Sequence, residues 1–299
     1  MADKVTVTVI VDNYIDIFLP SKVQAAYPFP GTGSRLLAEQ GLSLGVEVWN
    51  DQSVIRVLYD FGRSGTVFPH NAALLNIDLG RLEHLVLSHG HVDHYGAVQH
   101  VLENTEKSRL YLHPASDRKR YVRAPAGDMV GPWEIPAELI RRFETRVTFN
   151  TGPFRIASDT ILSGEIRRQT DFEEGMPNAF AELGGLLVHD DIPDDQALMI
   201  NLEGRGIVVI TGCCHAGLVN TVLHAQELFP GRPVHAVIGG FHLNTAKERQ
   251  MNETVNFLRT LDIRYLAALH CTGYWASRML MDRFPDQWIP GTVGARISL

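Results

Sequence analysis

The stretch from Leu85 to Gly96 constrains this chain more than any other. Its sequence, LVLSHGHVDHYG, places His89, His91, Asp93 and His94 directly after an apolar run. An amphipathic helical pattern follows, so these side chains are expected in a loop between a buried strand and a helix. Residues two apart in extended backbone point the same way, so His89 and His91 face one point while Asp93 and His94 turn toward a second. The spacing predicts two adjacent metal positions, and imidazole and carboxylate ligands suit zinc, iron or manganese.

Isolated histidines are usually core or surface residues, but this spacing rarely arises by accident. The hexad His-x-His-x-Asp-His resembles the signature of the metallo-β-lactamase-fold superfamily of metal-dependent hydrolases. Ser88 stands where Thr is commoner and Ala97 where Gly is common, and neither change removes a ligand. The resemblance extends from about Leu42 to Gly273. It implies an α/β fold, an αββα sandwich of two mixed β-sheets flanked by helices.

The remaining pattern fits one domain over residues 1–299. Val5 to Val11, Leu42 to Val48 and Ser53 to Tyr59 have the alternation of strands. Basic residues and prolines in residues 115–146 interrupt the alternation of predicted strands and helices, which predicts a helical or loop insertion. Its charged run, Arg118 to Arg123, is interpreted as a solvated face, with a basic rim for an anionic substrate as the alternative.

Three later strands end in histidines that lie in glycine-flanked turns: His215, His242 and His270. Ligands gather at the carboxyl ends of strands in α/β folds, so a site assembled from these ends and the hexad is expected. A catalytic zinc commonly has three protein ligands. His215 is therefore expected to complete the site of His89 and His91, with His242 as its competitor.

The superfamily resemblance matches His270 to the last metal ligand. It also shows two departures, because an acidic turn ending in Asp195 replaces the usual Gly-His-Thr hairpin and Gly212-Cys213 replaces Gly-Asp. The bridging carboxylate is thus missing or supplied from elsewhere. A particular branch shares the motifs at Gly212–Gly217, Gly239–Leu243 and His270–Gly273. That branch includes proteins similar to the dihydropterin-linked ribofuranosylaminobenzene 5'-phosphate synthase.

Further roles follow as hypotheses. Asp93 and Asp195 could steer the proton of a metal-bound water, and His242 could hold the substrate or stabilise negative charge. Asp60, in a sharp turn, is expected to support the ligand histidines, although turns favour Asp in any case. A cysteine nucleophile activated by histidine is a weaker alternative to a small buried residue or an occasional soft ligand. The expected substrate-binding residues are Glu165, Arg167, Phe241 and Thr272.

Composition narrows the class of protein. A net charge of -7 argues against a general nucleic-acid binder, and the absence of a long apolar run argues against a membrane protein. Three cysteines, with no signal-peptide pattern, favour a cytoplasmic setting. The expected function is hydrolysis of an ester, lactone or phosphoester by metal-activated water on one or two zinc ions. The alternatives are a synthase acting on a phosphorylated pterin-pathway precursor and a non-catalytic metal-binding protein. The expected partner is a small-molecule substrate, with an anionic one as an option, and a homodimer is one option for assembly.

Overall fold

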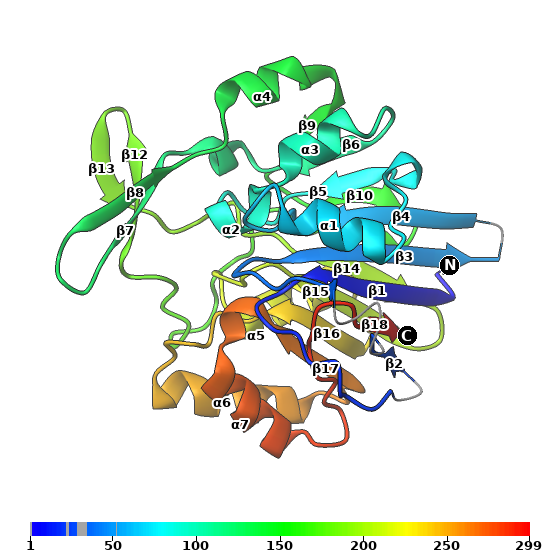
Figure 1. The fold of residues 1–299 in the computed structure, drawn as a ribbon. Helices are drawn as coiled ribbons and strands as arrows, with labels where there is room; N and C mark the ends of the chain where they lie inside the picture. Colours follow the sequence, from blue (N-terminus) through cyan, green and yellow to red (C-terminus); the bar gives the residue numbers. More distant parts are fainter. Residues whose placement is uncertain (1, 22–23, 29–34, 52) are drawn as a thin grey trace.

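Two large β-sheets face each other in the computed structural model, which describes residues 2–21, 24–28, 35–51 and 53–299 (Figure 1). The first has eight strands, in the spatial order β2 (Ala25–Ala26), β18 (Arg296–Ser298), β1 (Lys4–Val11), β3 (Ser43–Asn50), β4 (Ser53–Tyr59), β5 (His84–Val86), β6 (Arg109–Leu112) and β9 (Val147–Phe149). The second has six, in the order β10 (Phe154–Ala157), β11 (Thr160–Leu162), β14 (Leu198–Leu202), β15 (Gly206–Thr211), β16 (Val234–Gly240) and β17 (Tyr265–Leu269). Both sheets are mixed, as predicted.

The apolar faces of these sheets form the central core. Alternating valines of β1 and β3 pack against side chains of β14 to β17, and they are almost completely buried. Helices cover the outer faces because each presents an apolar stripe to its sheet. They are α1 (Val67–Leu74), α3 (Val98–Glu103) and α4 (Ala137–Arg142) over the first sheet, and α5 (Leu218–Leu228), α6 (Glu248–Thr260) and α7 (Tyr274–Arg283) over the second. The layers are therefore αββα, which confirms the predicted fold class.

Parallel pairing brings strand ends of each sheet to a common edge. In the first sheet β4, β5 and β6 are parallel, with Tyr59 opposite Val86 and Val86 opposite Tyr111. In the second, β15, β16 and β17 are parallel and end within a residue or two of one another. Loops that follow these strands therefore meet at one end of the sandwich, where the short helix α2 (Val92–Tyr95) also begins.

A third sheet projects from the sandwich beside this end (Figure 1). It consists of β13 (Leu186–His189), β12 (Ala179–Leu183), β7 (Arg120–Arg123) and β8 (Met129–Trp133), and is called the arm sheet below. Residues 115–146 were expected to be helix or loop. They contain α4 but also the β7–β8 pair, because two strands from residues 179–189 complete a sheet with them. Sequence periodicity within the segment gives no sign of partners so far along the chain.

Within the described ranges, no helix combines the length and the apolar character that crossing a bilayer requires.

Candidate metal centre

The loop after β5, residues 88–91, is called the histidine loop. Asp60, which follows β4, accepts two hydrogen bonds from this loop. The backbone N–H of Ser88 donates to Asp60 Oδ1 at 2.7 Å, and the Ser88 hydroxyl donates to Oδ2 at 2.8 Å. The same Oδ2 lies 2.7 Å from His94 Nδ1. Asp60 is completely buried, so these contacts fix both the loop and the ring of His94.

Three imidazole nitrogens converge above this loop. His89 Nε2 lies 2.9 Å from His91 Nδ1, and His215 Nε2 lies 3.2 Å and 3.1 Å from those two atoms. His215 reaches them from the loop after β15. These residues form the three-histidine group, the arrangement that the sequence predicted in preference to His242.

Hydrogen bonding cannot satisfy this triangle. Each nitrogen of a neutral imidazole is either a donor or an acceptor, so among three mutual contacts at least one joins two atoms of the same kind. A tetrahedral ion with bonds of about 2.1 Å holds its ligand nitrogens about 3.4 Å apart, close to the distances found. The three-histidine group therefore fits a metal ion by both chemistry and spacing.

A second group is formed by Asp93, His94 and His270, called the mixed group. Asp93 carboxylate oxygens lie 3.9 Å from His94 Nε2 and 3.3 Å from His270 Nε2. Although that nitrogen of His270 is buried and close to Asp93, it makes no hydrogen bond of acceptable geometry among the described residues. A group placed between them would satisfy it. Asn13 Oδ1, 3.0 Å from His270 Nδ1, orients the ring from the other side.

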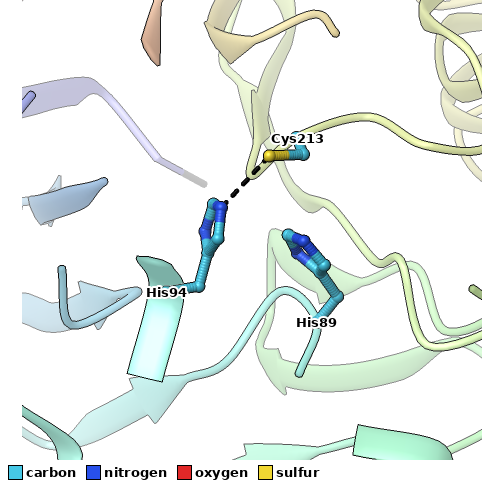
Figure 2. A group of neighbouring side chains, drawn as sticks. All are labelled: His89, His94 and Cys213. Atoms are coloured by element: carbon cyan, nitrogen blue, oxygen red, sulfur yellow. Dashed lines mark hydrogen bonds between the residues drawn. The ribbon is translucent and has the colours of Figure 1, made fainter. Parts of the chain in front are cut away.

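Cys213 lies between the two groups. Its Sγ is 3.1 Å from His94 Nε2, and the ligand atoms of His89, His94 and Cys213 all lie within 4.8 Å of one another (Figure 2). The rings of His89 and His94 are 4.2 Å apart between centroids. The sequence left open whether Asp195 or a cysteine replaces the bridging carboxylate, and of these Cys213 is the residue that lies beside both groups. Its signal was the strand-end motif Gly-Cys, where the superfamily usually has Gly-Asp.

The electrostatics differ between the groups. Burial lowers the pKa of His89 and His215 far below the usual value and that of His91 to about 4, so all three are neutral at pH 7 and free to coordinate. Burial would lower the pKa of His94 too, but the carboxylates of Asp60 and Asp93 raise it to about 9. Burial acts on Asp93 in the opposite direction, yet the contact with His270 and the charge of His94 hold its pKa well below the usual range.

Both groups open on one cavity of about 580 Å³. His91, Asp93, His215 and His270 line its floor, together with Cys213. The opposite wall comes largely from the arm sheet and the segment before β12, and it is mainly apolar: Val122, Ala124, Val130, Trp133, Met176 and Pro177. Arg63 adds a cation to the rim.

Several predicted site residues lie elsewhere. Asp195 is buried against the His215 loop, accepts the backbone N–H of Ala216 at 2.9 Å, and lines a different cavity that also contains Glu165. Burial raises the pKa of Asp195 to about 6. Phe241 belongs to the core beneath the second sheet, and the hydroxyl of Thr272 accepts the N–H of Phe241.

The remaining two substrate-binding expectations also fall outside the main cavity. Glu165 Oε1 is 3.0 Å from His113 Nε2, and Arg167 is exposed without lining that cavity. Phe241 and Thr272 adjoin candidate ligands in the sequence but turn toward the core, whereas Glu165 and Asp195 line a separate cavity. His242, in contrast, lines the cavity beside His215, with ring centroids 4.4 Å apart.

Arg120 is the second residue whose place the sequence did not reveal. It was interpreted as part of a solvated charged face, yet it is only 2% exposed. Its Nε donates to Asp190 at 2.7 Å and its Nη2 to Asp194 at 2.5 Å, while Asp194 also accepts the backbone N–H of Gly90. The interpretation was wrong for Arg120 because two carboxylates some 70 residues away neutralise it.

The family model for the metallo-beta-lactamase superfamily matches residues 54–212, which is more than half of the chain and includes the whole histidine loop. The chain belongs to the metallo-beta-lactamase superfamily.

Two curated relatives of this superfamily member come from Methanocaldococcus jannaschii. One is named 7,8-dihydropterin-6-methyl-4-(beta-D-ribofuranosyl)-aminobenzene-5'-phosphate synthase; it is 28% identical over 268 residues, which are 88% of this chain and 91% of that protein. An uncharacterized protein is 29% identical over 268 residues, 89% and 95% of the two chains. A crystal structure described as a metal-dependent hydrolase of the beta-lactamase superfamily aligns with a TM-score of 0.75 at 24% identity, over 99% of this chain and 98% of that one. This last similarity supports the fold.

Proposed function

We propose that this protein is a metal-dependent hydrolase acting on an ester, lactone or phosphoester. The observation that carries the proposal is the meeting of the three-histidine group and the mixed group on the floor of one cavity. Superfamily membership supports a divalent metal at such a site, and zinc suits the ligands, with iron and manganese as the other options.

In this proposal His89, His91 and His215 hold one ion, and Asp93, His94 and His270 hold the other. The sulfur of Cys213, which lies between the two groups, would serve as an additional ligand in place of the carboxylate that the superfamily usually has. Bound divalent metal lowers the pKa of a coordinated water toward about 7 and polarises the oxygen of the bond to be broken. Asp60 keeps the ring of His94 in place, which is the usual task of a carboxylate behind a ligand histidine.

The two aspartates expected to steer protons take different parts. Asp93 faces the cavity, where its carboxylate would orient the attacking water through a hydrogen bond. Asp195 does not line that cavity and acts on the backbone of the His215 loop instead. The chain thus needs no nucleophilic side chain for a hydrolysis of this kind.

The lining of the cavity supports a proposal about the substrate's form. An apolar wall that includes Trp133 faces the candidate metal ligands on the cavity floor. The part of the substrate that contacts this wall is therefore apolar. Arg63 at the rim, rather than the buried Arg120, would meet an anionic substituent. The substrate is therefore a small molecule that joins an apolar part and an anionic part through a hydrolysable bond.

A synthase is the second candidate, and one observation favours it: the relative that matches over 88% of this chain carries the name of a synthase. In that case the same cavity would bind a phosphorylated, pterin-related precursor and a second reactant. The metal groups would then activate the bond being exchanged rather than a water molecule.

The decisive experiment is a comparison of chelated and reloaded protein on a panel of aryl esters, lactones and aryl phosphoesters. Hydrolysis should disappear on chelation and return with Zn²⁺, Mn²⁺ or Fe²⁺, and it should be absent in His89→Ala. Product formation only when a condensation partner is added would favour the synthase. Metal uptake without turnover of any substrate under either condition would leave a non-catalytic binding protein and overturn the proposal.

A further inference from the structure

Three further side chains that can ligate a metal lie at the same end of the sandwich. None of them belongs to the three-histidine group or to the mixed group. Cys213 follows β15, His242 follows β16 and Cys271 follows β17, so each comes from the end of a different parallel strand. Their ligand atoms lie within 4.8 Å of one another, and all three residues line the main cavity. They are called the two-cysteine group.

Local contacts hold this group together. Cys271 Sγ points back to the carbonyl oxygen of Cys213 at 3.5 Å. Gly240 makes room for that sulfur, because a Cβ atom at position 240 would lie 2.7 Å from it. His242 Nδ1 is buried and has no hydrogen-bond partner among the residues that the structure describes. A buried imidazole nitrogen without a partner is costly, and coordination is one way to satisfy the ring.

The donor set differs from that of the neighbouring groups. Two sulfurs and one imidazole nitrogen make a soft set, whereas the three-histidine group offers only nitrogen and the mixed group nitrogen and oxygen. Soft thiolates select ions such as Zn²⁺ or Cu⁺ over Mn²⁺ and Mg²⁺. Two cysteines and one histidine also form a known catalytic zinc set, with the fourth position left to water or substrate.

We propose that Cys213, His242 and Cys271 form a third ion position, which takes a thiophilic ion such as Zn²⁺ and opens on the substrate cavity. Two thiolates neutralise the charge of a divalent ion, which limits the cost of holding it in a buried place. Cys213 then serves two neighbours, since its sulfur also lies 3.1 Å from His94 Nε2. The proposal requires the two other groups only as neighbours and does not depend on hydrolysis.

Zinc stoichiometry provides the first test. The full chain is stripped with a chelator, reloaded with Zn²⁺ and freed of unbound metal by gel filtration, and zinc per chain is measured by elemental analysis. Wild type should retain three equivalents, and both Cys271→Ser and His242→Ala should retain two. The matched control is Cys214→Ser, because Cys214 Sγ instead faces Thr221 Oγ1 at 3.2 Å in the core under α5. This control should retain three.

Cobalt absorption provides the second readout. Protein reloaded with Co²⁺ should show a thiolate-to-cobalt charge-transfer band that weakens in Cys271→Ser and persists in Cys214→Ser. Circular dichroism identifies a variant that fails to fold, and His242→Ala then replaces Cys271→Ser. If both variants bind as much zinc as wild type and keep the full band, the third position does not exist.

The outcomes also separate this inference from the proposed function. His89→Ala should lose one zinc equivalent while keeping the thiolate band. If instead wild type binds a single equivalent that is lost in Cys271→Ser, the two-cysteine group is a metal position but the two-ion hydrolytic site is wrong. If wild type binds two equivalents that both persist in Cys271→Ser, only the further inference fails.

Discussion

Arg120 and Asp194 form a buried ion pair, with Nη2 2.5 Å from Oδ1, and the other oxygen of Asp194 accepts the N–H of Gly90 at 2.7 Å. A charge on the arm sheet is thereby connected through one carboxylate to the backbone between two candidate metal ligands. Ser116 and Arg120 also occupy the space beside Gly90 where a Cβ atom would stand. The arm sheet is therefore packed and hydrogen-bonded directly against the histidine loop.

Replacing Arg120 should destabilise the fold strongly. Arg120→Met removes the partner of Asp190 and Asp194, both completely buried, and breaking a buried pair on one side costs about 3–5 kcal/mol. Urea unfolding of the metal-free protein measures the change. Arg118→Met is the control. Arg118 is partly exposed and its contact with Asp190 is long, at 3.5 Å, so its loss should cost about 1 kcal/mol or less. Equal effects of the two substitutions would contradict the role given to Arg120.

The same pair predicts a pH dependence. Burial would raise the pKa of Asp194, but Arg120 and the N–H of Gly90 hold it below the ordinary 3.8. Because the folded-state pKa is lower than the unfolded one, this stabilisation is present above about pH 4 and is lost as the pH falls through the folded-state value. In Asp194→Asn the free energy of unfolding should thus fall less steeply below pH 4 than in wild type. Parallel curves for the two proteins would show that the ion pair contributes no such dependence.

Asp60 should control metal affinity without being a ligand. Asp60→Asn keeps the shape of the side chain but weakens the charged contact to His94, and losing such a partner typically lowers metal affinity about 10- to 100-fold. Competition with a metal-binding dye measures the dissociation constants. Asp78→Asn, at an exposed turn that caps a short 3₁₀ helix, should leave them unchanged. An unaltered affinity in Asp60→Asn would leave Asp60 as an ordinary turn residue.

His215 and His242 should behave differently toward metal. His215→Ala removes one of three ligands, so the ion shared with His89 and His91 should be lost and the melting temperature of reloaded protein should fall. His242→Ala should retain that ion, because His242 lies outside the three-histidine group. Because each variant should lose one zinc equivalent, cobalt absorption and calorimetry provide the comparison: the thiolate band should persist in His215→Ala and weaken in His242→Ala. If His242→Ala loses the ion and His215→Ala keeps it, the two assignments must be exchanged.

Sequence alone could predict the features that depend on strand order and strand ends. The hexad after β5, and His215 and His270 after β15 and β17, meet because parallel strands end at one edge of each sheet. His215 could even be assigned to His89 and His91, since the chain offers no histidine in the acidic turn that replaces the usual hairpin.

Other features depend on distances between segments far apart in the chain. The sequence allowed Cys213 to be a small buried residue or an occasional soft ligand, and its contact with His94 depends on a facing loop far away in the chain. Arg120 belonged to a charged run whose other members gave no reason to expect burial, and its carboxylate partners follow β13. Phe241 and Thr272 are adjacent to candidate ligands in sequence but turn toward the core, which no local pattern distinguishes.

The arm sheet supplies much of the wall of the cavity, while the two large sheets supply its floor. In the proposed function, the residues that contact the substrate and those that hold the metal would thus come from separate parts of the chain, which Arg120 connects. Substituting the side chains of Val122, Val130 and Trp133 should change which compounds the cavity accepts and leave the candidate metal ligands in place. Transplanting the arm into another member of the superfamily would require Asp190, Asp194 and a glycine at position 90 to accompany it.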